Sequence, residues 1–98
     1  MKETLEQLTT GKQRLIDKGW FQGNNRKAGQ HCAFTALPTC ASLETIRALY
    51  VALPKNHLRR YPSSDKPTVA IIAFNDNPKT TEKDILDLYD RAIAWEKV

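Results

Sequence analysis

Apolar residues recur at helical spacing in three long stretches of the chain, and these stretches outline the fold. The first covers residues 3–18. Charged residues surround one apolar stripe there, which consists of Leu5, Leu8, Leu15 and Ile16. Gly19 follows directly, where a glycine in the left-handed conformation often ends a helix. The pattern therefore predicts a helix over residues 3–18.

The other two stretches carry clear signals at their ends. Ser42 is a favourable N-cap residue, and Pro54 follows a predicted helix that runs to about residue 53. The apolar stripe of this helix is Leu43, Ile46, Leu49 or Tyr50, and Leu53. Thr81 and Asp84 have the spacing of a capping box, which predicts a helix over residues 82–96. Its buried stripe is expected to be Ile85, Leu88, Tyr89, Ala92 and Ile93.

Two short apolar segments are less distinctive. Residues 31–37 end at Pro38, and we favour a short helix there. In residues 68–74 the valine and isoleucines favour a strand, whereas Pro67 in a first-turn position favours a helix. A lone strand would have no partner in the chain, so we expect a helix and keep a short strand as the alternative. The segments 22–30 and 55–66 are predicted to be loops.

Together these elements predict a mainly α fold, in which residues 1–98 form a single domain. We expect a small bundle of four to five short helices. The chain is 41% hydrophobic and 27% charged, which is typical of globular proteins and excludes compositional disorder. Its longest apolar run is residues 69–74, whereas a membrane span needs about 20 apolar residues, and no secretory signal opens the sequence. We therefore expect no membrane insertion and a cytoplasmic location, in a host cell.

The net charge of +4 is concentrated in the middle of the chain. Residues 18–60 hold seven Lys or Arg residues and one Glu, a net charge of +6, whereas residues 61–98 are net −2. Basic loops of this kind contact phosphate groups or acidic protein surfaces, and Arg and Tyr commonly anchor interfaces. We therefore predict a partner-binding surface that consists of Arg26, Lys27, Arg59, Arg60 and Tyr61.

Candidate chemistry centres on Cys32. A cysteine nucleophile needs a lowered pKa, usually from a helix N-terminus or an imidazolium. His31 is adjacent in sequence and Asp76 could orient a base, so a catalytic set, if there is one, is Cys32, His31 and Asp76. The favoured alternative is a buried packing thiol, because apolar residues surround Cys32. The metal-ligand types His31, Cys32, Cys40 and His57 lack the close pairs of structural zinc, so we predict no metal and no cofactor.

Three motifs occur in order along the chain: GWFQG at residues 19–23, CAFTAL at 32–37 and AFND at 73–76. Together they resemble an uncharacterised family of small bacterial and phage proteins grouped as a domain of unknown function. Thr35 stands where the family usually has glycine, and Phe74 where it usually has tryptophan. The resemblance implies no known reaction, but it implies a cluster of Trp20, Gln22, Gly23, Cys32, Asn75 and Asp76. We interpret this cluster as a polar clasp that holds the bundle together, with a reactive cysteine and an acid partner as the alternative.

The resemblance to phage proteins also shapes the expected function. Small phage proteins without a catalytic set often act by binding a host protein. We expect a non-enzymatic binding protein that blocks a host protein or nucleoprotein complex, for example as a host-defence antagonist. The alternatives are a cysteine-dependent enzyme centred on Cys32 and a sequence-tolerant nucleic-acid-binding domain. We expect the protein to be a monomer or a small homo-oligomer.

Overall fold

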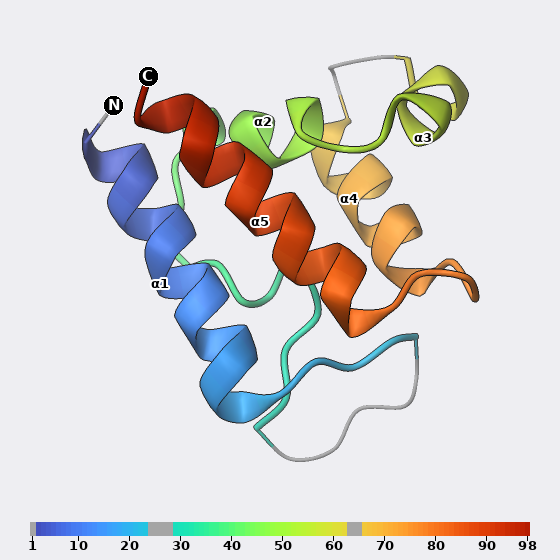
Figure 1. Ribbon diagram of the computed structural model, residues 1–98, viewed down its shortest axis with the longest axis horizontal. Helices are drawn as coiled ribbons and strands as arrows, with labels where there is room; N and C mark the ends of the chain where they lie inside the picture. Colours follow the sequence, from blue (N-terminus) through green and yellow to red (C-terminus); the bar gives the residue numbers. More distant parts are fainter. Residues whose placement is uncertain (1, 24–28, 63–65) are drawn as a thin grey trace.

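Five α-helices make up most of the chain that the computed structural model describes, which is residues 2–23, 29–62 and 66–98 (Figure 1). They are α1 (Lys2–Lys18), α2 (Leu43–Val51), α3 (Lys55–Arg60), α4 (Pro67–Asp76) and α5 (Glu82–Glu96). These described ranges contain no β-strand and one isolated bridge, between Trp20 and His31. The predicted mainly α fold is therefore confirmed.

The longest helices, α1 and α5, lie side by side and run in opposite directions, with both chain ends at the same edge of the molecule (Figure 1). A Cβ atom placed on Gly11 would lie 2.7 Å from Cε1 of Tyr89, so the absence of a side chain at Gly11 allows the fully buried Tyr89 ring to pack there. The buried face of α1 consequently follows Thr4, Leu8, Gly11 and Leu15. Ile16 is 54% exposed, so its predicted place on the buried stripe is wrong. It lies about 100° round the helix from Leu15.

The predicted starts of α2 and α5 are confirmed, whereas α2 ends at Val51, two residues before the predicted end. Ser42 caps α2 by accepting a hydrogen bond from the backbone N–H of Thr45. Thr81 and Asp84 form the full capping box at the start of α5, each side chain accepting from the other residue's backbone N–H. Both caps satisfy donors that the first turn of a helix leaves free. Along α5, the buried side chains are those of the predicted stripe: Ile85, Leu88, Tyr89 and Ala92, with Ile93 partly buried.

The ambiguous segment 68–74 belongs to α4, so the predicted helix is confirmed and the strand alternative is wrong. Pro67 occupies the first turn, where a missing N–H costs nothing. One face of α4 is buried and comprises Pro67, Ala70, Ile71, Phe74 and Asn75. Val69 and Ile72 lie on the exposed face. The strand preference of the β-branched residues therefore does not decide the secondary structure of this segment, because packing against α2 and α3 buries one face of a helix.

Two predictions of local structure are wrong. Residues 31–37 form a turn rather than a short helix. Within it, the N–H of Ala36 bonds to the carbonyl of Cys32 and that of Leu37 to the carbonyl of Phe34. Pro38 prevents this turn from continuing. The segment 55–66, predicted as a loop, contains the short helix α3, whose first bonds run from the N–H groups of His57 and Leu58 to the carbonyl of Pro54.

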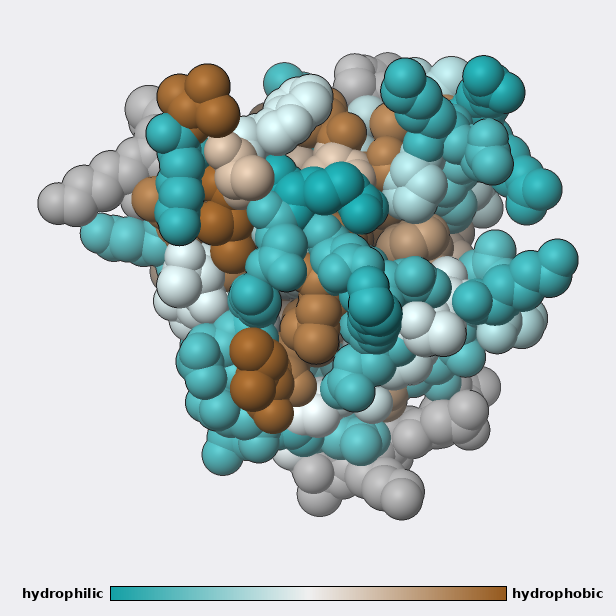
Figure 2. All heavy atoms as spheres, viewed as in Figure 1, coloured by the Kyte–Doolittle hydropathy of each residue, from teal (hydrophilic) through white to brown (hydrophobic). Residues whose placement is uncertain are grey.

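Hydrophilic side chains cover most of the face formed by α1 and α5, and the hydrophobic ones appear there in separate spots (Figure 2). Strongly hydrophilic side chains gather over α3, at the upper right of this view. In the described part of the chain, no helix combines the length and the apolar character needed to cross a membrane.

Candidate functional site

The side chain of Asn75, near the end of α4, lies at the centre of a buried polar cluster. Its Oδ1 accepts hydrogen bonds from Trp20 Nε1 at 2.6 Å and from the backbone N–H of Ala33 at 2.9 Å. Its Nδ2 donates to the carbonyl of Phe21 at 3.2 Å and to Asp76 Oδ1 at 3.0 Å. Asn75 is fully buried, and these four bonds use the whole hydrogen-bonding capacity of its amide. One side chain thus joins α4 to two separate parts of the segment between α1 and α2.

Gln22, Gly23 and Asp76 extend this cluster to the C-terminal end of α4. The Gln22 amide donates to the carbonyl of Asn75 at 3.0 Å and also to that of Asn77. Helix carbonyls at this end lack partners within the helix, so Gln22 acts as a cap from a distant part of the chain. Asp76 Oδ1 accepts from the backbone N–H of Gly23 at 2.9 Å. We call Trp20, Gln22, Gly23, Asn75 and Asp76 the Asn75 cluster.

Cys32 lies beside the Asn75 cluster without bonding directly to its side chains. Its backbone N–H donates to Thr35 Oγ1 at 2.9 Å, and its Sγ accepts from the N–H and the hydroxyl of Thr35 at 3.3 and 3.4 Å. The next residue, Ala33, bonds to Asn75 through its N–H and accepts at 2.6 Å from the Tyr89 hydroxyl through its carbonyl. Burial raises the pKa of Tyr89 far above its usual value, so the phenol stays a donor. The turn is therefore held by Asn75 of α4 and by Tyr89 of α5.

The structure does not join Cys32, His31 and Asp76 into one hydrogen-bonded set. The Asp76 carboxylate bonds to Gly23 and Asn75, and the His31 backbone pairs with Gly19 and Phe21. Cys32 is 8% exposed, whereas Cys40 is exposed. Residues 2–23, 29–62 and 66–98 contain no group of three or more His, Cys, Asp or Glu side chains that could hold a metal ion.

Two of the predicted partner-binding residues lie on the exposed surface of α3. Arg59 and Arg60 are exposed, and the described residues include no carboxylate paired with either. Tyr61 is half-buried, because its carbonyl accepts from the Tyr50 hydroxyl at 2.6 Å and its ring lies 4.9 Å from that of His57. Arg26 and Lys27 lie outside the described residues.

His57 is a site residue that the sequence pattern does not identify; it is considered there only among the metal-ligand types. It is 9% exposed, and its Nε2 lies 2.7 Å from the carbonyl of Ala70 in α4. A carbonyl only accepts, so Nε2 carries the proton in this bond. The ring also meets the edge of Phe74, with centroids 5.4 Å apart. His57 thereby attaches α3 to α4 and forms one wall of a cavity.

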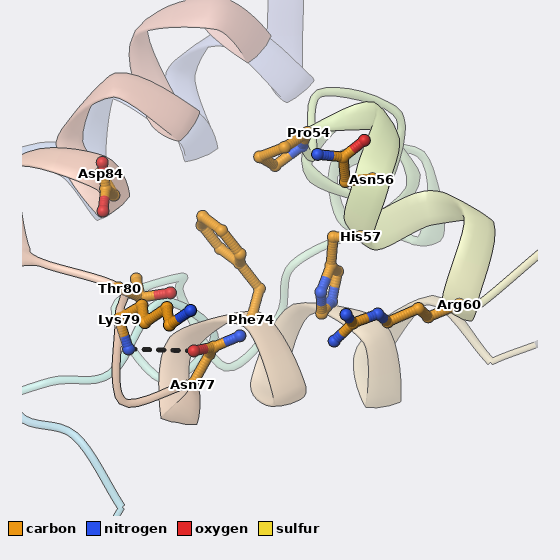
Figure 3. A pocket seen from close by; sticks show the side chains of 9 residues that line it. All are labelled: Pro54, Asn56, His57, Arg60, Phe74, Asn77, Lys79, Thr80 and Asp84. Atoms are coloured by element: carbon orange, nitrogen blue, oxygen red, sulfur yellow. Dashed lines mark hydrogen bonds between the residues drawn. The ribbon is translucent and has the colours of Figure 1, made fainter.

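This cavity has a volume of about 310 Å³ and lies between α3, the end of α4 and the start of α5 (Figure 3). Besides His57, its lining includes Arg60, Phe74, Lys79 and Asp84. Sequence spacing gives no signal for this grouping, because the residues come from three separate segments. Only the basic pair at residues 59 and 60 pointed to this region.

Comparison with known proteins gives one match. The family model described as "Family of unknown function (DUF6197)" matches residues 1–94. Searches of the curated proteins and of the solved structures found no significant match. The resemblance carried by the three motifs is thereby confirmed at the level of an uncharacterised family. Because the match covers almost the whole chain, the protein belongs to this DUF6197 family of unknown function.

Proposed function

We propose that the protein is non-enzymatic and acts by binding another macromolecule through a basic surface on α3. This surface, which we call the α3 basic surface, comprises Lys55, Arg59 and Arg60. All three side chains are exposed, and α3 contains no acidic residue. This concentration of positive charge, to which no described carboxylate is paired, is the observation that carries the proposal.

The position of α3 suits a contact surface. His57 is buried against α4 and Leu58 is partly buried, so the inner side of α3 is fixed to the core while its arginines face outward. Rigid presentation reduces the entropy lost when a partner binds. Arg is also the basic residue best suited to carboxylate and phosphate groups, because its planar guanidinium donates in a fork.

The polar groups inside the molecule support a binding protein over an enzyme. In the Asn75 cluster, the amide of Asn75 is used completely in bonds within the chain. The thiol of Cys32 is largely buried and accepts from Thr35. Both arrangements favour a structural clasp over a reactive centre, since a catalytic group must reach its substrate.

The partner we propose is an acidic protein surface or a nucleoprotein complex inside a host cell. We propose that the protein, as one encoded by a mobile element, acts in this way as an antagonist of host defence. The α3 basic surface fits nucleic acid as well, so the experiment includes a nuclease arm. Phosphate backbone contacts lose affinity steeply with salt.

The test is affinity capture from a bacterial lysate, with and without nuclease, using the wild-type protein and two double variants. Arg59→Glu with Arg60→Glu reverses the α3 basic surface. Lys18→Glu with Lys97→Glu makes the same change in net charge at two exposed lysines elsewhere. We expect the first variant to lose capture and the second to retain it. Equal capture by both variants, or equal loss, contradicts the proposal. Loss of every captured protein after nuclease treatment shows that nucleic acid is the partner instead.

A further inference from the structure

We propose that the cavity beside α3 binds a small molecule that carries a phosphate group and hydroxyl groups, about the size of a sugar phosphate. At about 310 Å³ the cavity is at the lower end of the range for small-molecule sites. The inference shares Arg60 with the α3 basic surface but goes beyond it, since it rests on groups that line the cavity.

Two cations that line the cavity would hold the phosphate between them. Arg60 extends from α3 and Lys79 from the turn after α4; both line the cavity, and their side chains extend toward each other from its two ends (Figure 3). No ion pair involves either side chain within the described ranges. A phosphate dianion offers three oxygens and enough charge for a guanidinium fork and an ammonium together. A carboxylate, with one charge and two oxygens, would leave one cation unmatched.

Two acceptors in the cavity call for hydroxyl groups on the ligand. Asp84 uses Oδ2 to accept from the N–H of Thr81, and no described residue bonds to its other oxygen. His57 uses Nε2 for the carbonyl of Ala70, and no described residue bonds to Nδ1. Since no fully buried side-chain nitrogen or oxygen in the described ranges lacks a partner, Nδ1 is not fully buried, and His57 lines the cavity. In the neutral ring Nδ1 is an acceptor.

Apolar side chains complete the site. The Phe74 ring stands between Asp84 on one side and His57 on the other, with Pro54 near it (Figure 3). A sugar ring can lay its C–H face on such a surface while its hydroxyls reach the two acceptors. The arrangement therefore combines a phosphate end, a hydroxyl end and an apolar wall in one cavity.

The experiment follows amide chemical shifts of the ¹⁵N-labelled protein during titration with ribose 5-phosphate, inorganic phosphate or ribose. We expect saturable shifts around His57, Lys79 and Thr80 with ribose 5-phosphate, and affinity about tenfold higher than for inorganic phosphate. Ribose without phosphate should give no saturable shift. Absence of saturable shifts up to about 10 mM ribose 5-phosphate overturns the proposal. Equal affinity for the sugar phosphate and inorganic phosphate overturns the assignment of the hydroxyl acceptors.

Two neighbouring arginines provide the matched control. Arg60→Gln should weaken ribose 5-phosphate binding about tenfold or more, because it removes a charged donor from the cavity. Arg59→Gln removes the same charge outside the cavity lining and should change affinity by less than about threefold. Equal weakening by both variants would show general charge attraction and overturn the site. A negative result in the ribose 5-phosphate titration does not contradict the proposed function. That function is tested separately, by whether the Arg59→Glu, Arg60→Glu variant still captures a macromolecule.

Discussion

Replacing Asn75 by Asp tests whether the Asn75 cluster holds the bundle together. The change keeps the shape of the side chain and keeps Oδ1, which can still accept from Trp20 and Ala33. The second oxygen replaces the Nδ2 donor and faces the carbonyl of Phe21 and the carboxylate of Asp76. Two hydrogen bonds thus become contacts between acceptors.

The magnitude follows from the burial of Asn75. Each buried polar group left without a partner costs about 1–3 kcal/mol, and the new charge lies beside that of Asp76. We expect Asn75→Asp to lower the free energy of unfolding by about 3–5 kcal/mol at neutral pH. Because a domain of this size is stable by about 5–15 kcal/mol, this is a large part of the total.

The loss should depend on pH. Burial and the neighbouring carboxylate raise the pKa of the new side chain in the folded state above its unfolded value of about 3.9. The folded state then binds a proton that the unfolded state has already released, so the free energy of unfolding falls as pH rises through this interval. At low pH the protonated carboxyl can donate to Phe21 again. The difference between wild type and variant should therefore be smaller at about pH 5 than at about pH 8.

Urea denaturation followed by far-UV circular dichroism measures both effects. Asn56→Asp makes the same chemical change at an exposed position of α3 and is expected to stay within about 0.5 kcal/mol of wild type. If Asn75→Asp is as stable as Asn56→Asp at pH 8, or if its loss is larger at the lower pH, the reasoning about the cluster is refuted.

Three further predictions concern other parts of the fold. Gly11→Ala should lower the free energy of unfolding by about 1–2 kcal/mol, because overpacking against Tyr89 outweighs the helix preference of alanine. Thr10→Ala, on the exposed side of α1, should cause no such loss. Equal effects of the two variants in urea denaturation would contradict this. Thr81→Ala should cost about 1 kcal/mol through loss of the capping box, and an unchanged melting temperature would argue against it. Cys32 should resist iodoacetamide at neutral pH while the exposed Cys40 reacts. Mass spectrometry of the native protein checks this, and modification of Cys32 at the rate of Cys40 would revive the reactive-cysteine alternative.

The sequence predicts most reliably those features that depend on nearby residues. Ser42, Thr81 and Asp84 cap backbone groups within three positions, so their spacing alone identifies the starts of α2 and α5. The turn at residues 31–37 depends instead on a bond from Ala33 to Asn75, more than forty positions away. No local pattern contains that information. Similarly, α3 is stabilised by the burial of His57 against α4, and its sequence alone looks like a basic loop.

The candidate sites show the same division. The resemblance carried by the motifs predicts which residues form a cluster. The structure joins Trp20, Gln22, Gly23, Asn75 and Asp76 in one hydrogen-bonded group, and Cys32 bonds to Thr35 beside it. The cavity beside α3 could not be predicted, because Arg60, Lys79 and Asp84 come together only through the packing of three segments. Charge counting located one of these residues and gave no information on the others.

The backbone bonds beside the Asn75 cluster also determine where the chain can be lengthened. Phe21 and His31 are tied by a bond from the N–H of Phe21 to the carbonyl of His31, and the N–H of His31 bonds to the carbonyl of Gly19. An insertion between Phe21 and His31 leaves both of these bonds in place, and doubling the length of a connection costs only about 0.6 kcal/mol. An insertion of the same size between Asn77 and Thr80 would separate two carbonyls that both accept from the Gln22 amide. A peptide tag or a second domain is therefore better grafted between Gly23 and His31 than between α4 and α5.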